Sequence, residues 1–540
     1  MVSKKNLFKF FTLLVLVACA SGLKEQMLDY RKSLEQLNLA KAHSILEKSV
    51  LKTDSKSKLL WHLENGSINF MQKNYDEAIK NFQTSLDIID DLYTTRISSL
   101  IVGALIDSRD EFEGAGYERS LAHYYLARSY YEKYLAHGER SDLFGARAAI
   151  LAWDSYFQSI NRSPMKTIYR TDLLLKIFGA QIHEQINTRN DGQIALQLYK
   201  DALKMSESIG GIFNYFNEES LEYIKELESG KEKKKFKATI GHQDFMDFLK
   251  YKILSLTYDL RRYEFDKMAK DLKASPEMIK RSKRTPNVSI ILEEGLIAKK
   301  VGREFNFGIK GAIDKVEDPK TKEAIKKHGV PMIGAFAMNV LGLVPKNLST
   351  GSFIFAHQFT TLAVSEMAIQ FELPMIEEAP KLKRLGLYVM DGDSKVVEIR
   401  PLALVTQTSD LARTILEEEA VSEYVRKGTR VALKHLTAIT AAFVLYNQLK
   451  TPENDFIARS VALGSYVAST KVIAAMEEAD TRQWISLPEA IRMQEFDLKP
   501  GKYKLGLAPF TDDGTWPDQP SKELGEVEVS KNKALFTFRL

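Results

Sequence analysis

Small and aromatic residues follow one another at helical spacing near the start of the chain, and this pattern limits the possible folds more than any other feature. Residues 62–87 contain, in order, Gly66, Phe70, Tyr75, Ala78 and Phe82. Side chains three or four positions apart share one face of a helix. Gly66 and Ala78 leave room for two antiparallel helices to approach closely, while Tyr75 and Phe82 fill the space toward a neighbouring pair. We therefore predict a tight helical hairpin in this stretch.

The same scheme recurs upstream and downstream within the first 208 residues. The copies carry it at Leu39, Ala42 and Leu46, within residues 126–160, and at Gly179, Ala195, Tyr199 and Ala202. This spacing resembles the tetratricopeptide repeat, whose helix pairs stack into a solenoid. The resemblance implies four stacked pairs between about residues 23 and 208, and a generic helical bundle is the alternative.

Helix pairs of this kind expose their first helices along a concave face, where an extended peptide or a partner's helix commonly binds. Aligning the copies places five residues on that face: Tyr124, Arg128, Tyr131, Lys176 and His183. Aromatic rings beside cations suit a peptide carboxylate or a stacked side chain. We therefore predict a protein or peptide partner in this groove, with ordinary packing and a solvated rim as the alternative for these side chains.

From Asn287 onward the pattern indicates strands. Residues 287–296, 299–309, 367–375, 383–399 and 401–408 alternate apolar and polar side chains between Gly and Pro residues, which is typical of strands and hairpins. Asp391, Gly392 and Asp393 predict a tight turn, and Pro500 and Gly501 predict another within a small antiparallel β module. The fold class that we predict is α+β, with a tetratricopeptide-like α-solenoid, a mixed strand and helix domain, and this terminal module.

A helical hairpin rich in alanine interrupts the strands. Arg426, Arg430 and Lys434 recur every four residues and therefore form one basic ridge on a helix. A second alanine-rich helix follows Pro452 and is expected to be its antiparallel mate. Small residues at this density let helices pack closely in water or in lipid. We expect a hairpin buried in protein, and insertion of its tip, or of the apolar stretch 330–345, into a membrane is the alternative.

The predicted divisions of the chain follow from these patterns. They are residues 1–18, a lipoprotein signal peptide; 19–208, tetratricopeptide-like helical repeats; 209–285, a helical extension and basic linker; 286–405, a strand-rich region; 406–495, the alanine-rich hairpin with a distinctive segment; and 496–540, the C-terminal β module.

The chain contains a single cysteine, Cys19, at the end of its first apolar run. Lys4, Lys5 and Lys9 precede that run, which is far shorter than the roughly 20 residues of a membrane-spanning helix. Residues 16–19, Leu-Val-Ala-Cys, resemble the lipobox of bacterial lipoproteins, in which the cysteine thiol receives the lipid. The resemblance implies lipidation at Cys19. Ala20 and Ser21 after it imply the outer membrane, with the protein on its periplasmic face.

A distinctive segment begins at Ala479. Asp480, Arg482, Trp484 and Pro488 in the stretch ADTRQWISLP resemble the C-terminal pattern of a family of bacterial outer-membrane lipoproteins that also have a tetratricopeptide-like region. The resemblance implies an identity and no catalytic residue. From the residues themselves, Asp480 and Arg482 are candidates for an ion pair that orders a turn, with Trp484 as a hydrophobic plug beside it.

No pattern in the sequence predicts a reaction. The nine histidines are scattered, and we find neither the spacing of a zinc site nor a phosphate-binding glycine loop. The formal net charge of +5 favours no nucleic-acid partner. We therefore predict no metal, no cofactor and no enzyme, but a membrane-anchored periplasmic scaffold for envelope assembly or regulation. The alternatives are a lipid-contacting envelope component and a peptidoglycan-active enzyme.

Overall fold

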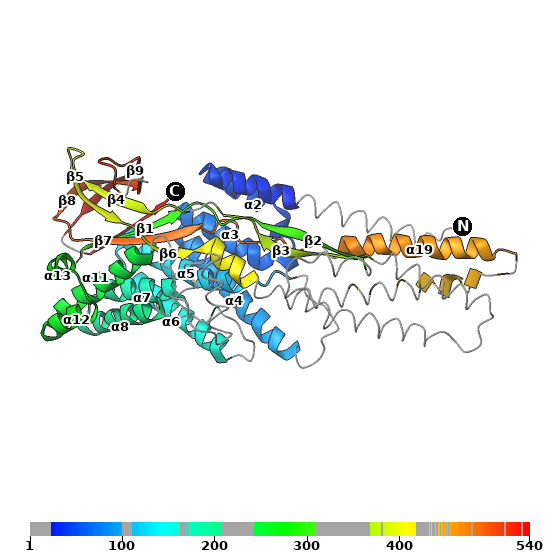
Figure 1. Cartoon of the computed structure of the whole chain (residues 1–540), viewed down its shortest axis with the longest axis horizontal. Helices are drawn as coiled ribbons and strands as arrows, with labels where there is room; N and C mark the ends of the chain where they lie inside the picture. Colours follow the sequence, from blue (N-terminus) through cyan, green and yellow to red (C-terminus); the bar gives the residue numbers. More distant parts are fainter. Residues whose placement is uncertain are drawn as a thin grey trace. The chain divides into compact units, whose positions relative to one another are not determined.

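The structure is a computed structural model that describes most of the chain in two compact units (Figure 1). The described residues are 23–99, 111–162, 169, 172–206, 242–284, 286–308, 368–379, 382–416, 453–476, 479–511, 515–530 and 533–540, with short stretches between 431 and 451. Unit 1 comprises Met1–Lys299, Glu378–Ile415 and Arg482–Leu540, and unit 2 comprises Lys300–Glu377 and Leu416–Thr481. Cys19, Arg426, Arg430 and residues 330–345 lie outside the described residues.

Consecutive helix pairs make up the first part of unit 1. They are residues 23–35 with α2 (Leu39–Glu47), α3 (Lys58–Met71) with α4 (Tyr75–Ser99), α5 (Gly116–His137) with α6 (Arg140–Arg162), and α7 (Leu173–Ile186) with α8 (Arg189–Ser206). The turn inside each pair contains one residue with positive φ, namely Leu37, Lys73, Gly138 or Asn187. The four pairs therefore share one way of reversing the chain. Next come α11 (His242–Leu260), which packs on α8, α12 (Phe265–Asp271) and α13 (Pro276–Arg281).

The predicted close approach of helices occurs at Gly66. A Cβ atom on Gly66 would lie 2.8 Å from the ring of Phe82, which belongs to the partner helix. At Gly179 the same atom would lie 3.1 Å from Ile150. Glycine is therefore used at both positions because a neighbouring side chain occupies the space of a Cβ atom.

Two four-stranded sheets form the second part of unit 1. The first has the order β10-β1-β7-β6, with β10 (Ala534–Arg539), β1 (Val288–Glu294), β7 (Ala490–Phe496) and β6 (Ala403–Gln407). The second has the order β5-β4-β8-β9, with β5 (Val396–Pro401), β4 (Leu385–Met390), β8 (Gly501–Pro509) and β9 (Lys522–Val529). All pairings are antiparallel except that of β1 with β10, which is parallel.

The two sheets pack face to face over an apolar core that includes Ile290, Leu292, Val389, Leu505 and Val527. Because side chains alternate along a strand, β1 turns Ser289, Ile291 and Glu293 toward its other face. There Glu293 contacts α5. The first sheet therefore lies between the second sheet and the helices, as Figure 1 shows for β1, β7 and β6.

The strands at 288–294, 385–390, 396–401 and 403–407 confirm the strand predictions. The turn at residues 391–394 is also confirmed, since Asp391 accepts hydrogen bonds from the backbone of Asp393 and Lys395. The terminal module differs from the prediction, because β10 joins the first sheet beside β1 while β8 and β9 join the second. Pairing between distant segments explains why the two units do not follow the linear divisions.

Unit 2 contains a ribbon of two antiparallel strands and the alanine-rich hairpin. The strands are β2 (Lys300–Gly308) and β3 (Ala368–Ile376). In the hairpin, α19 (Asp455–Met476) packs its Ala458, Ala462 and Tyr466 against Ala442 and Tyr446 of the preceding helical stretch. The Tyr446 hydroxyl donates to Asp455 across the turn. The predicted packing of two alanine-rich helices is confirmed for these residues, and Lys434 lies in the first helical stretch.

Among the described residues, no helix is long and apolar enough to cross a membrane.

Candidate functional site

Helices α3 and α5 hold an extended segment of the distant C-terminal region, which we call the Trp484 segment (Arg482–Ser486). The backbone N–H of Trp484 donates to Glu118 of α5 at 2.8 Å. The backbone N–H groups of Ile485 and Ser486 donate to the carboxylate of Glu64 on α3. Two helix carboxylates thus bind three consecutive peptide N–H groups, an arrangement that we call the clamp.

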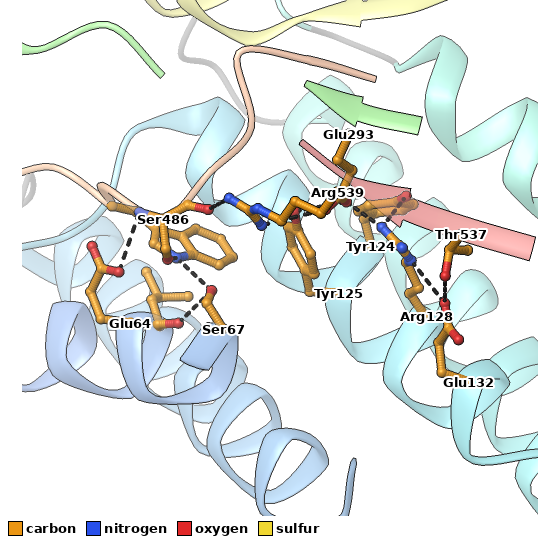
Figure 2. A network of polar contacts seen from close by, with 12 residues as sticks. Glu64, Ser67, Tyr124, Tyr125, Arg128, Glu132, Glu293, Ser486, Thr537 and Arg539 are labelled. Atoms are coloured by element: carbon orange, nitrogen blue, oxygen red, sulfur yellow. Dashed lines mark hydrogen bonds and ion pairs between the residues drawn. The ribbon is translucent and has the colours of Figure 1, made fainter. Parts of the chain in front are cut away.

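The indole of Trp484 is fully buried and anchors this segment. Its ring centroid lies 5.9 Å from that of Phe82 and 5.6 Å from that of Tyr125. Its Nε1–H donates to the hydroxyls of Ser67 and Ser486, both at 2.9 Å. Figure 2 shows Glu64 and Ser67 on one helix, pointing toward Ser486. Trp484 is thus buried between aromatic rings, as expected of a hydrophobic plug.

Arg482 fixes the start of the Trp484 segment. Its guanidinium donates to the carbonyl of Lys56 at 3.1 Å and to the hydroxyl of Ser57 at 3.2 Å. These two residues lie just before α3, so Arg482 adds one more contact between the Trp484 segment and the helices. Asp480 is exposed and Pro488 is buried.

A buried ion pair joins α5 to the first sheet beside the clamp. Arg128 of α5 pairs with Glu293 of β1, and both side chains are almost completely buried. The hydroxyl of Tyr125 donates to the same carboxylate at 2.9 Å, and Arg539 of β10 approaches it at 3.4 Å. Figure 2 shows these side chains meeting between helix and strands. Glu293 is therefore surrounded by three donors that come from two different elements.

Further contacts connect the ion pair with the clamp into one network. Arg539 also donates to the carbonyl of Ser486, at the end of the Trp484 segment. On the other side, Thr537 of β10 donates to Glu132 at 2.6 Å, and Arg128 lies 3.5 Å from the same carboxylate. Helices, Trp484 segment and strands are thus tied together by charged and polar groups that lie away from water (Figure 2).

Burial and neighbouring charge shift the pKa values within this network. Burial raises the pKa of Glu64 to about 7, against the opposing effect of its donors Ser486 and Tyr30. Burial lowers the pKa of Arg128, but Glu293 together with Tyr124, Glu132 and Tyr125 outweighs this, so the pKa of the guanidinium lies well above its usual value. The charged form of Arg128 is therefore favoured.

A second buried charge cluster lies between α7, α11 and β7. Lys252 pairs with Glu184 at 2.9 Å and also with Glu495, and Lys533 approaches Glu184 at 3.0 Å. Burial raises the pKa of Glu184, but Lys252 and Lys533 outweigh it and lower that pKa to about 2. Glu184, Glu495 and Lys533 also line a small polar pocket with Gln181 and Ser289. In this cluster, as in the pair of Arg128 and Glu293, charged side chains from a helix and from a strand neutralise each other.

The five residues predicted to line an open groove take part in contacts within the chain. Tyr124, Arg128, Tyr131 and His183 are buried. Lys176 is partly buried and donates to Asp154 at 2.8 Å. The ring of His183 is hydrogen-bonded to Asp191 at 2.7 Å. The prediction that Arg128 lines an open groove is wrong, because it pairs with Glu293 of the chain's own β1, where a partner's carboxylate was expected.

Sequence reasoning missed the carboxylates of Glu64 and Glu118, which hold the Trp484 segment, and that of Glu132 beside Arg128. All three lie on helices, where an isolated acid usually points to solvent. A signal for Glu64 is that Leu60 and Ile68, four residues before and after it on the same helix face, are apolar. Neighbouring Glu293 and Glu294 point apart: Glu293 contacts Arg128, whereas Glu294 pairs with Arg492 at 2.9 Å.

Comparisons with known proteins gave no match: no protein-family model matches the chain, and neither curated proteins nor solved structures show a significant similarity.

Proposed function

We propose that the protein is a lipid-anchored scaffold on the periplasmic face of the bacterial outer membrane, where it binds other envelope proteins. The lipobox-like sequence that ends in Cys19 supports the anchor. The consecutive helix pairs with their common turn geometry support a tetratricopeptide-like array. Arrays of this type are generally binding surfaces rather than catalysts.

The clamp on the Trp484 segment is the observation that carries this proposal. The helices bind a segment of the chain through its backbone N–H groups and one aromatic anchor, and this contact supports a capacity of the helix pairs to hold a peptide. Here the bound segment belongs to the same chain, so the array and the β-sandwich form one closed body. The buried charges are matched across elements, and pairs of this kind serve to fix an arrangement. A binding partner would then contact the outside of this body or unit 2.

Metabolic labelling tests the anchor. Cells that express the protein would be grown with a palmitate analogue, and the mature chain should carry the label. The Cys19→Ser variant is the matched control and should carry none. Failure of the original chain to label, in cells that label their other lipoproteins, would remove the proposed location.

Crosslinking of intact envelopes, followed by mass spectrometry, tests the scaffold. We expect crosslinks from exposed lysines of unit 1 or unit 2 to a small set of envelope proteins. An unrelated lipoprotein of the same abundance provides the background. If both proteins give the same set of neighbours, the scaffold proposal is wrong. Purified chain that changes the mass profile of peptidoglycan fragments would instead favour an enzyme.

A further inference from the structure

One face of α19 is apolar and exposed along most of the helix. Its exposed positions are Phe456, Ile457, Ser460, Val461, Gly464, Val467, Ala468, Lys471 and Val472, which we call the outer face of α19. Phe456 is 80% exposed, Ile457 62% and Val467 48%. The spacing of three or four residues makes this set one continuous stripe. Lys471 carries the only charge within it.

The opposite face of α19 is apolar as well, and it is packed. Ala458, Ala462 and Tyr466 contact Ala442 and Tyr446 of the preceding helical stretch. A surface helix normally combines one apolar face with one polar face, and a helix that is apolar on all sides is normally buried on all sides. The outer face is therefore expected to have a partner of its own.

Gly464 lies at the centre of the outer face, and the small residues around it indicate which kind of partner fits there. Glycine within a helix lowers its stability, yet among the described residues no atom would lie within 4 Å of a Cβ atom at Gly464. The packing around it thus does not require a glycine. Ser460 and Ala468 lie one turn to either side, so three small residues form a shallow groove. Such a groove lets the backbone of a second helix approach closely.

We propose that the outer face of α19 binds the same face of a second copy of the chain, in an antiparallel helix pair centred on Gly464. A two-fold axis through this residue places Ser460 opposite Ala468 and Val461 opposite Val467. It also places Phe456 opposite Val472 at each end. The same patch thus serves both copies, which is the rule for a closed dimer. The proposal goes beyond a scaffold for other proteins, because it gives the scaffold a means of assembling with itself.

The exposed area fits this occupant. The five large apolar residues of the outer face are between 36% and 80% exposed. With up to about 250 Å² for an aromatic residue and less for the aliphatic ones, they offer roughly 500 Å² per copy, or about 1,000 Å² for the pair, which meets the minimum of about 1,000 Å² expected of a biological interface. The stripe is about 24 Å long, at about 1.5 Å per residue, and therefore suits a second long helix.

A lipid surface suits the outer face less well than a second copy. Helices that lie in a membrane interface turn a strongly charged face to water. The opposite face of α19 is instead packed on alanine and tyrosine side chains. A lipid surface also gives no reason for three small residues in line at the centre of the stripe.

Sedimentation velocity on the mature chain with Cys19→Ser, at micromolar concentration, tests the proposal. We expect a dimer. Gly464→Leu and Val467→Glu should each weaken dimerisation at least tenfold. The space at Gly464 is open and leucine favours a helix, so circular dichroism should show that this variant stays folded. Val397→Glu is the matched control, since Val397 of β5 is 54% exposed and lies in unit 1; it should leave the dimer unchanged.

Disulfide crosslinking tests the orientation. Cys19 is the only cysteine, so Ser460→Cys and Ala468→Cys can each be added singly to the Cys19→Ser chain. After oxidation, a mixture of the two variants should give a dimer that joins position 460 to position 468. Each variant alone should give much less. Crosslinks only between identical positions would overturn the antiparallel pairing.

A chain that stays monomeric would overturn the proposal, as would a dimer that Gly464→Leu and Val467→Glu do not affect. Flotation of the Cys19→Ser chain with vesicles of anionic phospholipid, lost on Val467→Glu, would show that the outer face contacts lipid instead. These experiments use soluble protein without its anchor. Their failure would therefore leave the labelling and envelope crosslinking of the scaffold proposal to be judged separately.

Discussion

The strongest prediction concerns the ion pair between Arg128 and Glu293. Glu293→Gln removes a carboxylate that faces the Arg128 and Arg539 guanidiniums and the Tyr125 hydroxyl. Arg128 then loses its closest acidic partner and keeps Glu132, at 3.5 Å. Breaking a buried pair in this way costs about 3 to 5 kcal/mol of unfolding free energy. Arg128→Met leaves Glu293 with Arg539 as its only cationic partner and should cost a similar amount.

The double variant separates this pair from ordinary loss of packing. With Arg128→Met and Glu293→Gln together, both charges of the pair are removed, so the cost should lie well below the sum of the two single costs. We expect a coupling of about 2 to 4 kcal/mol. The measurement is urea unfolding followed by tryptophan fluorescence, because Trp484 and Trp153 are both fully buried in unit 1. Costs that simply add, or single variants as stable as the original chain, would refute the reasoning.

An exposed pair provides the control. Lys80 and Glu77 lie 3.8 Å apart on α4, with side chains that are 74% and 51% exposed. Lys80→Ala should change stability by less than about 0.5 kcal/mol, since water screens such pairs.

Three further predictions concern single positions in unit 1 or unit 2. Trp484→Ala should lower the unfolding free energy by about 3 to 5 kcal/mol in the same urea experiment. Trp484→Phe keeps most of the ring but loses the N–H donor, and should cost about 1 to 2 kcal/mol. Gly66→Ala should cost about 1 to 3 kcal/mol, because its Cβ would lie 2.8 Å from the ring of Phe82. Gly464→Ala should not destabilise α19 in a thermal scan, because no described residue lies within 4 Å of its Cβ. Burial, to which the nearby Asp410 adds, raises the pKa of Glu489 from 4.5 to about 8. The unfolded chain therefore loses this proton first, and stability should fall as the pH rises from about 4.5 to 8. Unfolding curves at several pH values should show Glu489→Gln without this loss, which amounts to about 3 to 5 kcal/mol for the original chain.

Local patterns predicted the elements because each depends on near neighbours in the chain. The close contact at Gly66 follows from the spacing of small and aromatic residues within one hairpin. The turn at Asp391 follows from its own side chain, which bonds the backbone two and four residues later. Helical and strand periodicities act over a few residues, and so they can be read from the sequence alone.

The sequence did not predict in the same way which distant segments contact the helices. Arg128 and Glu293 are 165 residues apart, and no local pattern tells which of the chain's many acids meets a given arginine. The parallel pairing of β10 with β1 joins segments more than 200 residues apart. Sequence reasoning found Arg128 and the Trp484 segment separately, as a site and as a distinctive stretch. It did not find that they belong to one network, because only the fold brings them together.

The charged groups in this network explain why unit 1 adopts a single arrangement. Apolar faces alone would let the helices slide along the sheet with little change in buried area. Glu64 and Glu118 instead accept hydrogen bonds from particular peptide groups. A shift by one residue would also move the Trp484 indole away from Ser67, Phe82 and Tyr125 and leave its buried N–H without these partners. Such a shift costs the desolvation of each unpaired group. The network therefore fixes the register of the Trp484 segment on the helices. This specificity, rather than a large gain in stability, is what the buried charges provide.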